Sequence, residues 1–366
     1  MKTVLIAHNY SVTTFSAMSY YFAHHLADTG HKVIFISHKP FFSEKQMVKT
    51  EKGEIHLYSW SSEKRPTSIA DFIWFSKIYR EHKPDIVIGH FVGTNISFIV
   101  SKLLSFWKVK TYEHYHTLSD QILTDLKKMS LKQRLLFFRR KLFYPIFCDQ
   151  IICTSQLGKE DLESFFGAKN SFVLLGPMVD RFESKKPISK DSIIISFLGR
   201  LDPSKGVIDL IEAFFKYKQK NPSSKISINI GGSGRLEAEI KELIKDNDSI
   251  NFVGPLTYDK VDDYFNQSHF SIIPSKIDNL PTVGLESLMN QTPILISNNT
   301  GLTQYLVDGK DCFKFDANVD AMISLLEKVE AKFEDCHEQM SIEARKTFMD
   351  KFSVKTYCED FSKAIL

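Results

Sequence analysis

The chain has 366 residues, of which 47 are Lys or Arg and 44 are Asp or Glu, so its formal net charge is only +3. That length exceeds what one hydrophobic core usually supports and predicts two domains of ordinary size. The balanced charge, with no basic tail, excludes the kind of protein that wraps nucleic acid. Five cysteines without paired or metal-like spacing favour reduced thiols in a cytoplasmic protein and give no reason to expect a structural zinc site.

The first half of the chain alternates short apolar runs with helical patterns. Residues 3–7 form an apolar run that is too short for the core of a signal peptide, and no later run approaches membrane-spanning length. A helical pattern over 16–30 ends on Gly30, and a strand is predicted over 31–37. This β-loop-α-β order is the unit of a parallel doubly wound sheet. Further strands are predicted over 85–90, 109–114 and 149–155.

The domain boundaries are predicted from a polar segment rich in charge and proline. We expect an N-terminal domain over 1–180, an exposed linker over 181–190 and a second domain over 191–345 that repeats the alternation. Residues 346–366 are expected to form a helix that packs back toward the N-terminal domain. Both domains are therefore predicted to be Rossmann-like α/β domains with parallel sheets.

A cationic turn follows the first predicted strand of the second domain. Gly199 and Arg200 stand at the carboxyl end of that strand, and Lys205 and Gly206 precede the next helix. Ligands of open α/β sheets bind outside such strand ends, and a helix N-terminus with nearby cations suits a diphosphate. Arg offers a planar fork of donors and Lys a compact charge. Two solvated loop cations would look the same in isolation.

A second loop carries two carboxylates, Asp278 and Glu286. Pro281 is typical of a first helical turn, so the helix is predicted to begin at Pro281 or Thr282, with the amides of 282–284 directed at an anion. A carboxylate can accept hydrogen bonds from two vicinal hydroxyls, which makes Glu286 a candidate ribose ligand and Asp278 a candidate ligand for sugar hydroxyls. A capping Asp and a surface Glu are the alternative.

These pieces together resemble the C-terminal domain of glycosyltransferase family four, whose members are retaining enzymes with the GT-B fold: two Rossmann-like domains facing across a cleft. The shared features are FLGRL, Lys205-Gly206, GGSG at Gly231–Gly234 and Asp278-x7-Glu286. The resemblance implies that Glu286 binds the donor ribose, Arg200 and Lys205 the diphosphate, and Asp278 the transferred sugar. The donor-binding set that it implies is Gly199, Asp278, Asn279, Leu280, Pro281, Thr282 and Glu286.

Two departures from the family leave the substrates open. The first carboxylate is Asp278 where the family has Glu, which leaves the donor sugar undefined. The loop after the first strand, HNYSVTTFS, lacks the paired glycines that many members have, which leaves the acceptor undefined.

Polar residues also end two strands of the first half. His90 ends one, and Glu113, His114 and His116 come at the end of the next. By the strand-end rule these are cleft positions. Since the family usually has a His there, His114 is predicted to be catalytic, with His116, His90 and Glu113 on the acceptor side. Ordinary loop histidines are the alternative. His114-x-His116 could suggest a metal ion, but no third ligand of convincing spacing follows, so no metal is expected.

Residues Lys127 to Lys141 contain seven basic residues and no acidic one. A helix is predicted here, with a core-facing stripe at Leu131, Leu135, Phe138 and Leu142. Three apolar residues would then fall outside that stripe: Leu136, Phe137 and Phe143. Apolar groups among cations fit a helix that lies on anionic lipid, and a solvated basic face is the alternative.

The resulting prediction is a metal-independent, retaining glycosyltransferase. It would transfer a sugar from a nucleotide-diphosphate-sugar to a glycan or lipid-linked acceptor in cell-surface polysaccharide biosynthesis (capsule, O-antigen or lipopolysaccharide), without a cofactor and without nucleic acid as a partner. Attachment to the inner face of the cell membrane is left open. The alternatives are a sugar-nucleotide epimerase of the same fold and a non-catalytic nucleotide-sugar-binding or membrane adaptor protein. A phosphorylase lacks a pyridoxal-binding Lys context, and an NAD dehydrogenase lacks its full glycine fingerprint.

Overall fold

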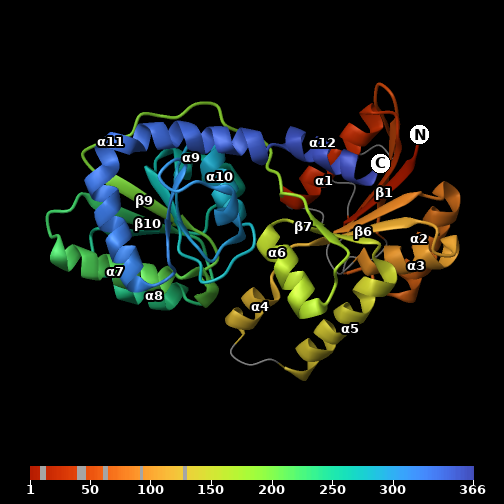
Figure 1. Cartoon of the computed structure of the whole chain (residues 1–366), viewed down its shortest axis with the longest axis horizontal. Coiled ribbons are helices and arrows are strands. Elements are labelled where there is room, and N and C mark those ends of the chain that lie inside the picture. Colours follow the sequence, from red (N-terminus) through yellow and green to blue (C-terminus); the bar gives the residue numbers. More distant parts are fainter. Residues whose placement is uncertain (9–13, 39–46, 61–64, 91–93, 127–129) are drawn as a thin grey trace. The chain divides into compact units, whose positions relative to one another are not determined.

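The computed structural model describes residues 1–8, 14–38, 47–60, 65–90, 94–126 and 130–366 (Figure 1). It divides into two compact units, each considered by itself. The first unit comprises Met1–His116, Met129–Val179 and Val354–Leu366, and the second comprises Thr117–Lys128 and Asp180–Ser353. None of the helices in these residues has a stretch both long and apolar enough to span a bilayer. All five cysteines are free thiols.

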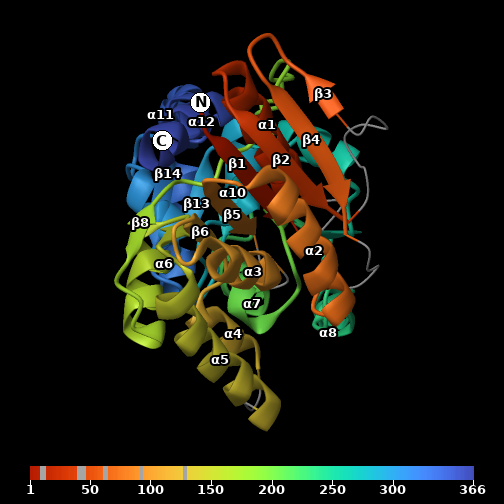
Figure 2. The ribbon, with the colours of Figure 1, turned by 90° about the vertical axis from the view of Figure 1, so that its right-hand side faces the viewer.

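The first unit is built on an eight-stranded sheet in the order β3-β4-β2-β1-β5-β6-β7-β8, whose neighbours are parallel except for β3 and β4. Figure 2 shows β1, β2 and β4 side by side. The strands are β1 (Thr3–His8), β2 (Lys32–Ser37), β3 (Met47–Lys49), β4 (Glu54–Ser59), β5 (Ile86–His90), β6 (Lys110–Tyr115), β7 (Gln150–Cys153) and β8 (Ser171–Val173). The strand order reverses between β1 and β5, which places the carboxyl ends of these two strands at a topological switch point.

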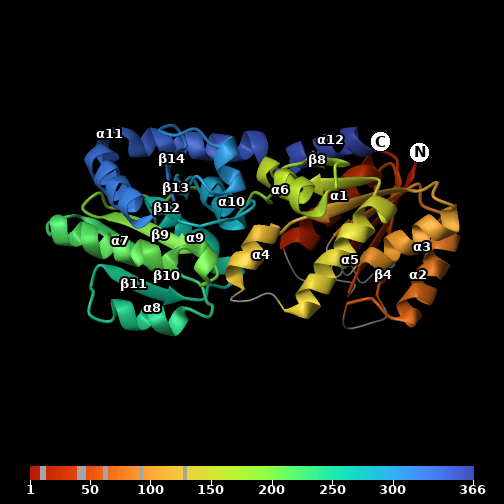
Figure 3. The same cartoon turned by 60° about the horizontal axis from the view of Figure 1, so that its bottom comes forward.

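Helices cover both faces of this sheet, because its strands are apolar on both sides. One face packs against α2, α3 and α5, and the other against α1 and α12. Figure 3 shows α2, α3 and α5 along one side of the unit. The helices are α1 (Thr14–Asp28), α2 (Ile69–His82), α3 (Asn95–Ser105), α5 (Leu131–Phe147), α6 (Gln156–Asp161) and α12 (Val354–Ile365), and a π-helical turn covers Leu162–Phe166.

The second unit has a six-stranded, wholly parallel sheet in the order β11-β10-β9-β12-β13-β14. Its order reverses between β9 and β12. The strands are β9 (Ile193–Leu198), β10 (Ile226–Gly231), β11 (Ile250–Gly254), β12 (Phe270–Ile273), β13 (Ile294–Ser297) and β14 (Cys312–Phe315). The α-helices are α4 (Ser119–Asp125), α7 (Val207–Lys220), α8 (Glu237–Ile244), α9 (Val261–Asn266), α10 (Thr282–Met289) and α11 (Val319–Lys351), and 3-10 turns cover η3 (Pro203–Lys205), η4 (Tyr258–Lys260) and η5 (Gly301–Tyr305). The predicted fold class, two α/β units with parallel sheets, is thus confirmed.

The unit boundaries differ from the expected domain boundaries in three places. Residues 117–128, expected in the N-terminal domain, group with the second unit because α4 contacts η3. The C-terminal return begins at Val354 and not at 346, because α11 continues to Lys351. The expected linker, 181–190, groups with the second unit and contains neither helix nor strand.

Helix α5 faces its core the opposite way from the prediction. Phe137 and Phe143 pack on the core of the first unit, and Phe137 lies edge-to-face with Phe165 at 5.2 Å. Burying this aromatic face removes more apolar area from water than burying a row of Leu would. The predicted core stripe is instead exposed, and so is Leu136. Lys127 and Lys128, the first two basic residues of the predicted segment, lie outside the described residues. The members of the exposed stripe are Leu131, Leu135, Phe138 and Leu142.

Candidate active site

The cationic turn of the second unit is shaped by close backbone packing. A Cβ on Gly232, whose φ is +125°, would lie 1.9 Å from the carbonyl oxygen of Gly199, so only glycine fits there. In the same turn, the carbonyl oxygen of Ser233 accepts a hydrogen bond of 2.9 Å from the amide of Leu201. GGSG therefore holds the backbone on both sides of Arg200 in place, which is a structural role that the spacing alone did not reveal.

Arg200 belongs to a cluster of two arginines and two aspartates. Its guanidinium donates to Asp202 at 2.5 Å and to Asp125 at 3.2 Å. Arg235 reaches the same two carboxylates, at 3.2 Å and 3.8 Å. The side chain of Arg200 is nevertheless 58% exposed, so these contacts orient the guanidinium and leave it accessible to a ligand. Neither aspartate nor Arg235 was predicted from the sequence, because no local pattern shows that Asp125, at the end of α4, lies beside Arg200.

Lys205 and Asp278, expected to bind different parts of the donor, form a direct ion pair. The Lys205 ammonium donates to Asp278 at 2.5 Å, and both side chains are largely buried. Gln121 Nε2 lies 3.5 Å from the other oxygen of Asp278, which also accepts the amide of Asn279 at 3.0 Å. The pair thus joins the turn after β9 to the loop after β12, and a diphosphate that binds the Lys205 ammonium must share this ammonium with Asp278.

Helix α10 begins at Thr282 with Pro281 as its N-cap, as the sequence predicts. Leu280 and Asn279 immediately precede it, and Asn279 is buried. One detail of the prediction is wrong: the amide of Gly284 is already used, because it donates to the carbonyl of Pro281 at 2.9 Å. The amides of Thr282 and Val283 remain the candidates for an anion at this helix end.

Glu286 lies on α10 as a buried carboxyl group. Burial raises its pKa to about 7, which Arg181 opposes and Asp262 reinforces. Arg181 is held by two hydrogen bonds to Asp262, at 2.8 Å and 2.9 Å, and by stacking on Tyr258. A carboxyl group with a pKa near neutrality is the kind of perturbed group that concentrates at functional sites. Arg181 lay inside the expected linker and was not predicted as a site residue.

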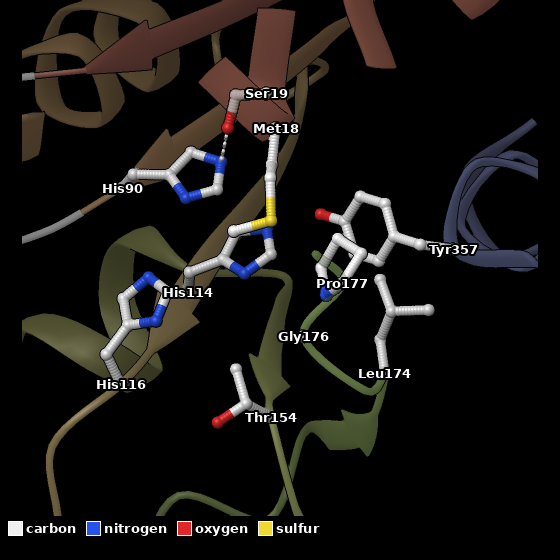
Figure 4. A pocket seen from close by; sticks show the side chains of 10 residues that line it. All are labelled: Met18, Ser19, His90, His114, His116, Thr154, Leu174, Gly176, Pro177 and Tyr357. Atoms are coloured by element: carbon white, nitrogen blue, oxygen red, sulfur yellow. Dashed lines mark hydrogen bonds between the residues drawn. The ribbon is translucent and has the colours of Figure 1, made fainter. Parts of the chain in front are cut away.

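In the first unit, histidines from three strands meet at the topological switch point. Figure 4 shows His90, His114 and His116 lining one pocket. The rings of His90 and His114 stack with centroids 3.9 Å apart, and His8, at the end of β1, stacks on His90 at 4.1 Å. The hydroxyl of Ser19 lies 2.7 Å and 3.0 Å from the Nε2 atoms of His8 and His90. The remaining pocket residues are Met18, Thr154, Leu174, Gly176, Pro177 and Tyr357.

These imidazoles are neutral at pH 7. Burial lowers the pKa of His90 and of His114 well below its ordinary value, and that of His116 to about 4. Neither ring nitrogen of His114 has a hydrogen-bond partner within the described residues. A neutral imidazole offers one donor and one acceptor, so this cluster suits hydroxyl groups better than an anion. His8 was not predicted, although its place after the first strand follows the rule that selected His90.

The histidine geometry corrects the expectation that His114-x-His116 has no third metal ligand. His90 supplies one: each of the three residues offers a nitrogen within 4.8 Å of the others. The spacing did not reveal it because His90 comes from a neighbouring strand. However, the rings of His90 and His114 are 15° from parallel and those of His114 and His116 are 9°. Their in-plane lone pairs therefore do not converge on one point, as tetrahedral coordination at 2.0–2.1 Å requires.

Glu113, expected beside these histidines, lies on the other face of β6. Successive side chains of a strand point to opposite faces, so His114 and Glu113 cannot share a pocket. The Glu113 carboxyl is buried, and its Oε2 has no hydrogen bond among the described residues. Burial raises its pKa to about 8, with Arg140 acting in the opposite direction. Glu113 is therefore a core residue of the first unit.

Two α/β units, whose sheets are parallel except for the β3–β4 pair, fit the GT-B class of folds. The family model for glycosyl transferases group 1 matches residues 178–347, and that for Glycosyltransferase Family 4 matches residues 17–181. Together the two models cover residues 17–347, so the chain belongs to the glycosyltransferases that these two models describe.

Individual similarities are more distant. An uncharacterized glycosyltransferase of Methanocaldococcus jannaschii is 28% identical over 60% of this chain and 57% of its own length. The capsular polysaccharide biosynthesis glycosyltransferase CapM of Staphylococcus aureus is 24% identical over 57% and 56%. The chain thus matches little more than half the length of these two relatives. HepE of Anabaena, solved with UDP, superimposes with a TM-score of 0.72 at 12% identity over 100% of this chain and 99% of that one.

Proposed function

We propose that this enzyme is a retaining glycosyltransferase that uses a nucleotide-diphosphate-sugar donor and acts on a glycan or lipid-linked glycan in cell-surface polysaccharide biosynthesis. The observation that carries the proposal is the Lys205–Asp278 ion pair, which joins the turn after β9 to the loop after β12, where the strand order of the second unit reverses. Exposed Arg200 lies on the first of these turns, and buried Glu286 lies on α10, the helix that follows the second. HepE has been solved with UDP-glucose, and CapM is named for capsule biosynthesis, which supports the donor and the pathway.

In this proposal each group of the second unit has one task. Ionised Glu286 accepts hydrogen bonds from the two ribose hydroxyls. Arg200 and Lys205 bind the diphosphate, and their charges stabilise the negative charge that grows on it as the bond from the anomeric carbon to the diphosphate oxygen breaks. Asp278 positions Lys205 through the 2.5 Å ion pair and is available to hydroxyls of the transferred sugar.

Retention of configuration fits attack on the same face that the diphosphate leaves. The acceptor oxygen bonds to the anomeric carbon, and its proton passes to the departing diphosphate oxygen, so no covalent enzyme intermediate and no divalent ion are needed. The neutral histidines of the first unit, His114 foremost, would hydrogen-bond to sugar hydroxyls. A burial-lowered pKa suits this task, because such an imidazole keeps both a donor and an acceptor at pH 7.

The testing experiment is a thermal-shift screen against nucleotide sugars of different bases, followed by NMR of the transfer product. A donor that binds only the native state raises the free energy of unfolding, by about 2.7 kcal/mol at one hundred times its Kd, and therefore raises the melting temperature. We expect one base to stand out and the product to keep the donor's anomeric configuration. An inverted product would remove the retaining mechanism. A donor epimerised without any acceptor would identify an epimerase, and binding without turnover a non-catalytic protein.

The acceptor side of the proposal includes attachment to a membrane. A lipid-linked glycan is presented at a bilayer surface, so an enzyme that elongates it gains from lying there. We therefore propose that the protein works as a peripheral protein on the membrane face where nucleotide sugars are available.

A further inference from the structure

Helix α5 carries an exposed apolar stripe that runs its whole length. Its residues recur at helical spacing and, at 100° per residue, fall within about 80° of arc. Leu131 is 83% exposed, and the other four are between 49% and 58% exposed. At 1.5 Å per residue the stripe is about 22 Å long. The members of the stripe are Leu131, Leu135, Phe138, Leu142 and Ile146.

Basic side chains line both edges of this stripe. By the same 100° rotation, Arg134 and Lys141 lie on one side of it and Lys132 and Arg139 on the other. All four are exposed, and α5 contains no Asp or Glu. Arg140, by contrast, points toward the core side, where its charge acts on the buried carboxyl of Glu113. A row of apolar groups between two rows of cations is the pattern of a helix lying in a lipid interface.

An aromatic turn continues the surface beyond the end of α5. Phe106 is 84% exposed and Trp107 52%, and both have left-handed backbone conformations, with φ of 53° and 62°. The indole of Trp107 donates to the carbonyl of Ile146 at 3.4 Å and stacks on Phe147. Non-glycine residues hold this conformation only where the surrounding structure enforces it, and such sites concentrate where function needs them. The indole of Trp107 is thus held beside Ile146, the last residue of the stripe, and exposed Phe106 precedes it in the same turn.

We infer that the α5 stripe, its four flanking cations and the Phe106–Trp107 turn together form a surface that docks on an anionic lipid bilayer. The apolar groups enter the boundary between headgroups and acyl chains, Trp107 lies at the headgroup level that indoles prefer, and the long basic side chains extend to the phosphates. The charge pattern selects this occupant: a second copy of this chain would set cations against cations. The inference adds the surface and its partner to the proposed function, but lipid binding itself does not depend on sugar transfer.

The experiment measures flotation of the whole protein with phosphatidylcholine vesicles, with and without phosphatidylglycerol. Wild-type protein should float with the anionic vesicles at low salt and less as salt rises. Replacing the four flanking cations by Ser should weaken binding more than a hundredfold, since each basic residue contributes about fivefold. The matched control removes four exposed Lys from α7, α8 and the C-cap of α8 and should float like wild type. The test set is Lys132, Arg134, Arg139 and Lys141, and the control set is Lys216, Lys220, Lys241 and Lys245.

Tryptophan emission tests the depth of insertion. Trp60 is buried and Trp74 half-buried, whereas Trp107 is exposed, so a blue shift on adding vesicles reports on this turn. The shift and its quenching by brominated lipid should disappear in Trp107→Phe. Wild-type protein that does not float at low salt, or a test set that floats like the control set, would overturn the inference. Dimerisation of the wild-type protein that Phe138→Ser abolishes would also overturn the inference.

Turnover of a water-soluble acceptor in the same samples separates this inference from the proposed function. If the protein transfers sugar but does not bind vesicles, only the inference of a docking surface is refuted. If it binds vesicles but no nucleotide sugar, the proposed function is refuted and the docking surface is supported.

Discussion

At the scale of single residues, the raised pKa of Glu286 should make donor binding depend on pH if this carboxyl group binds the ribose as proposed. Only the ionised carboxyl accepts from both ribose hydroxyls, so donor affinity should rise as the pH passes upward through about 7. Glu286→Gln should cost about 1.5–3 kcal/mol of donor binding, as for hydrogen bonds to a charged group, and should flatten that pH profile. Calorimetric titration with a nucleotide sugar from pH 6 to 8 checks both. A variant that keeps the wild-type profile would exclude Glu286 from the donor site.

Removing either cation of the turn should slow the reaction to a similar extent, but only the removal of Lys205 should also destabilise the fold. Arg200→Ala and Lys205→Ala should each lower kcat by about 10²-fold or more, with smaller effects on donor affinity, because the leaving-group charge grows toward the transition state. Lys205→Ala should also lower the melting temperature, because it leaves buried Asp278 without its 2.5 Å partner, whereas Arg200 is exposed. Steady-state kinetics and thermal melts distinguish the two. A rise in KM alone would make either residue a binding contact only.

Removing divalent ions should leave turnover intact. In the proposed mechanism, the cations and the start of α10 supply the charge that a metal would otherwise bring to the diphosphate. The assay is transfer of sugar before and after chelator treatment, with Mg²⁺, Mn²⁺ or Zn²⁺ added back. Activity that chelator abolishes and Mg²⁺ or Mn²⁺ restores would contradict the roles given to Arg200 and Lys205. Restoration by Zn²⁺ alone would point to the His90, His114 and His116 nitrogens, which lie within 4.8 Å of one another.

At the scale of elements, the donor site depends on how the β10 turn packs on the β9 turn. Gly232→Ala would force a Cβ against the carbonyl of Gly199, so the cationic turn should move and donor affinity should fall together with stability. Gly309→Ala is the comparison variant: its φ of +77° carries a left-handed backbone cost of about 1–2 kcal/mol, but nothing lies within 4 Å of the new Cβ. Equal melting temperatures and equal donor affinities in the two variants would show that the close packing is dispensable.

At the scale of the whole molecule, the chain enters the first unit, leaves it and returns. Phe361 on α12 is fully buried and stacks on Phe22 of α1 at 4.4 Å, while Phe348 on α11 is fully buried in the second unit. Each substitution to Ala should cost about 3–5 kcal/mol. Hydrogen exchange should locate the loss of protection in the first unit for Phe361→Ala and in the second for Phe348→Ala. Identical exchange patterns would mean that the two units do not unfold separately.

The sequence by itself determined the elements and the nature of the donor motifs. Apolar runs bounded by turn residues identified the parallel strands, and the strand-end rule selected Arg200, Lys205, His90 and His114, because parallel strands present their carboxyl ends at one edge. Asp278 and Glu286 were selected because they flank a predicted helix start and a carboxylate can accept from two hydroxyls. The start of α10 at Thr282 followed from Pro281 in the same local way. These features depend on residues a few positions apart, which is the range over which backbone geometry is fixed.

Only the tertiary structure decided which distant residues meet. It joined Lys205 to Asp278, brought Asp125 from α4 to Arg200, and added His8 and His90 to His114. It also showed that Glu113 lies in the core, and that the α5 stripe predicted from the spacing to face the core is exposed. The reason is the same in each case. Helical or strand period defines a face but not what lies opposite it, and the competition between two apolar faces of α5 is settled by the volume and area that each can bury against the neighbouring elements.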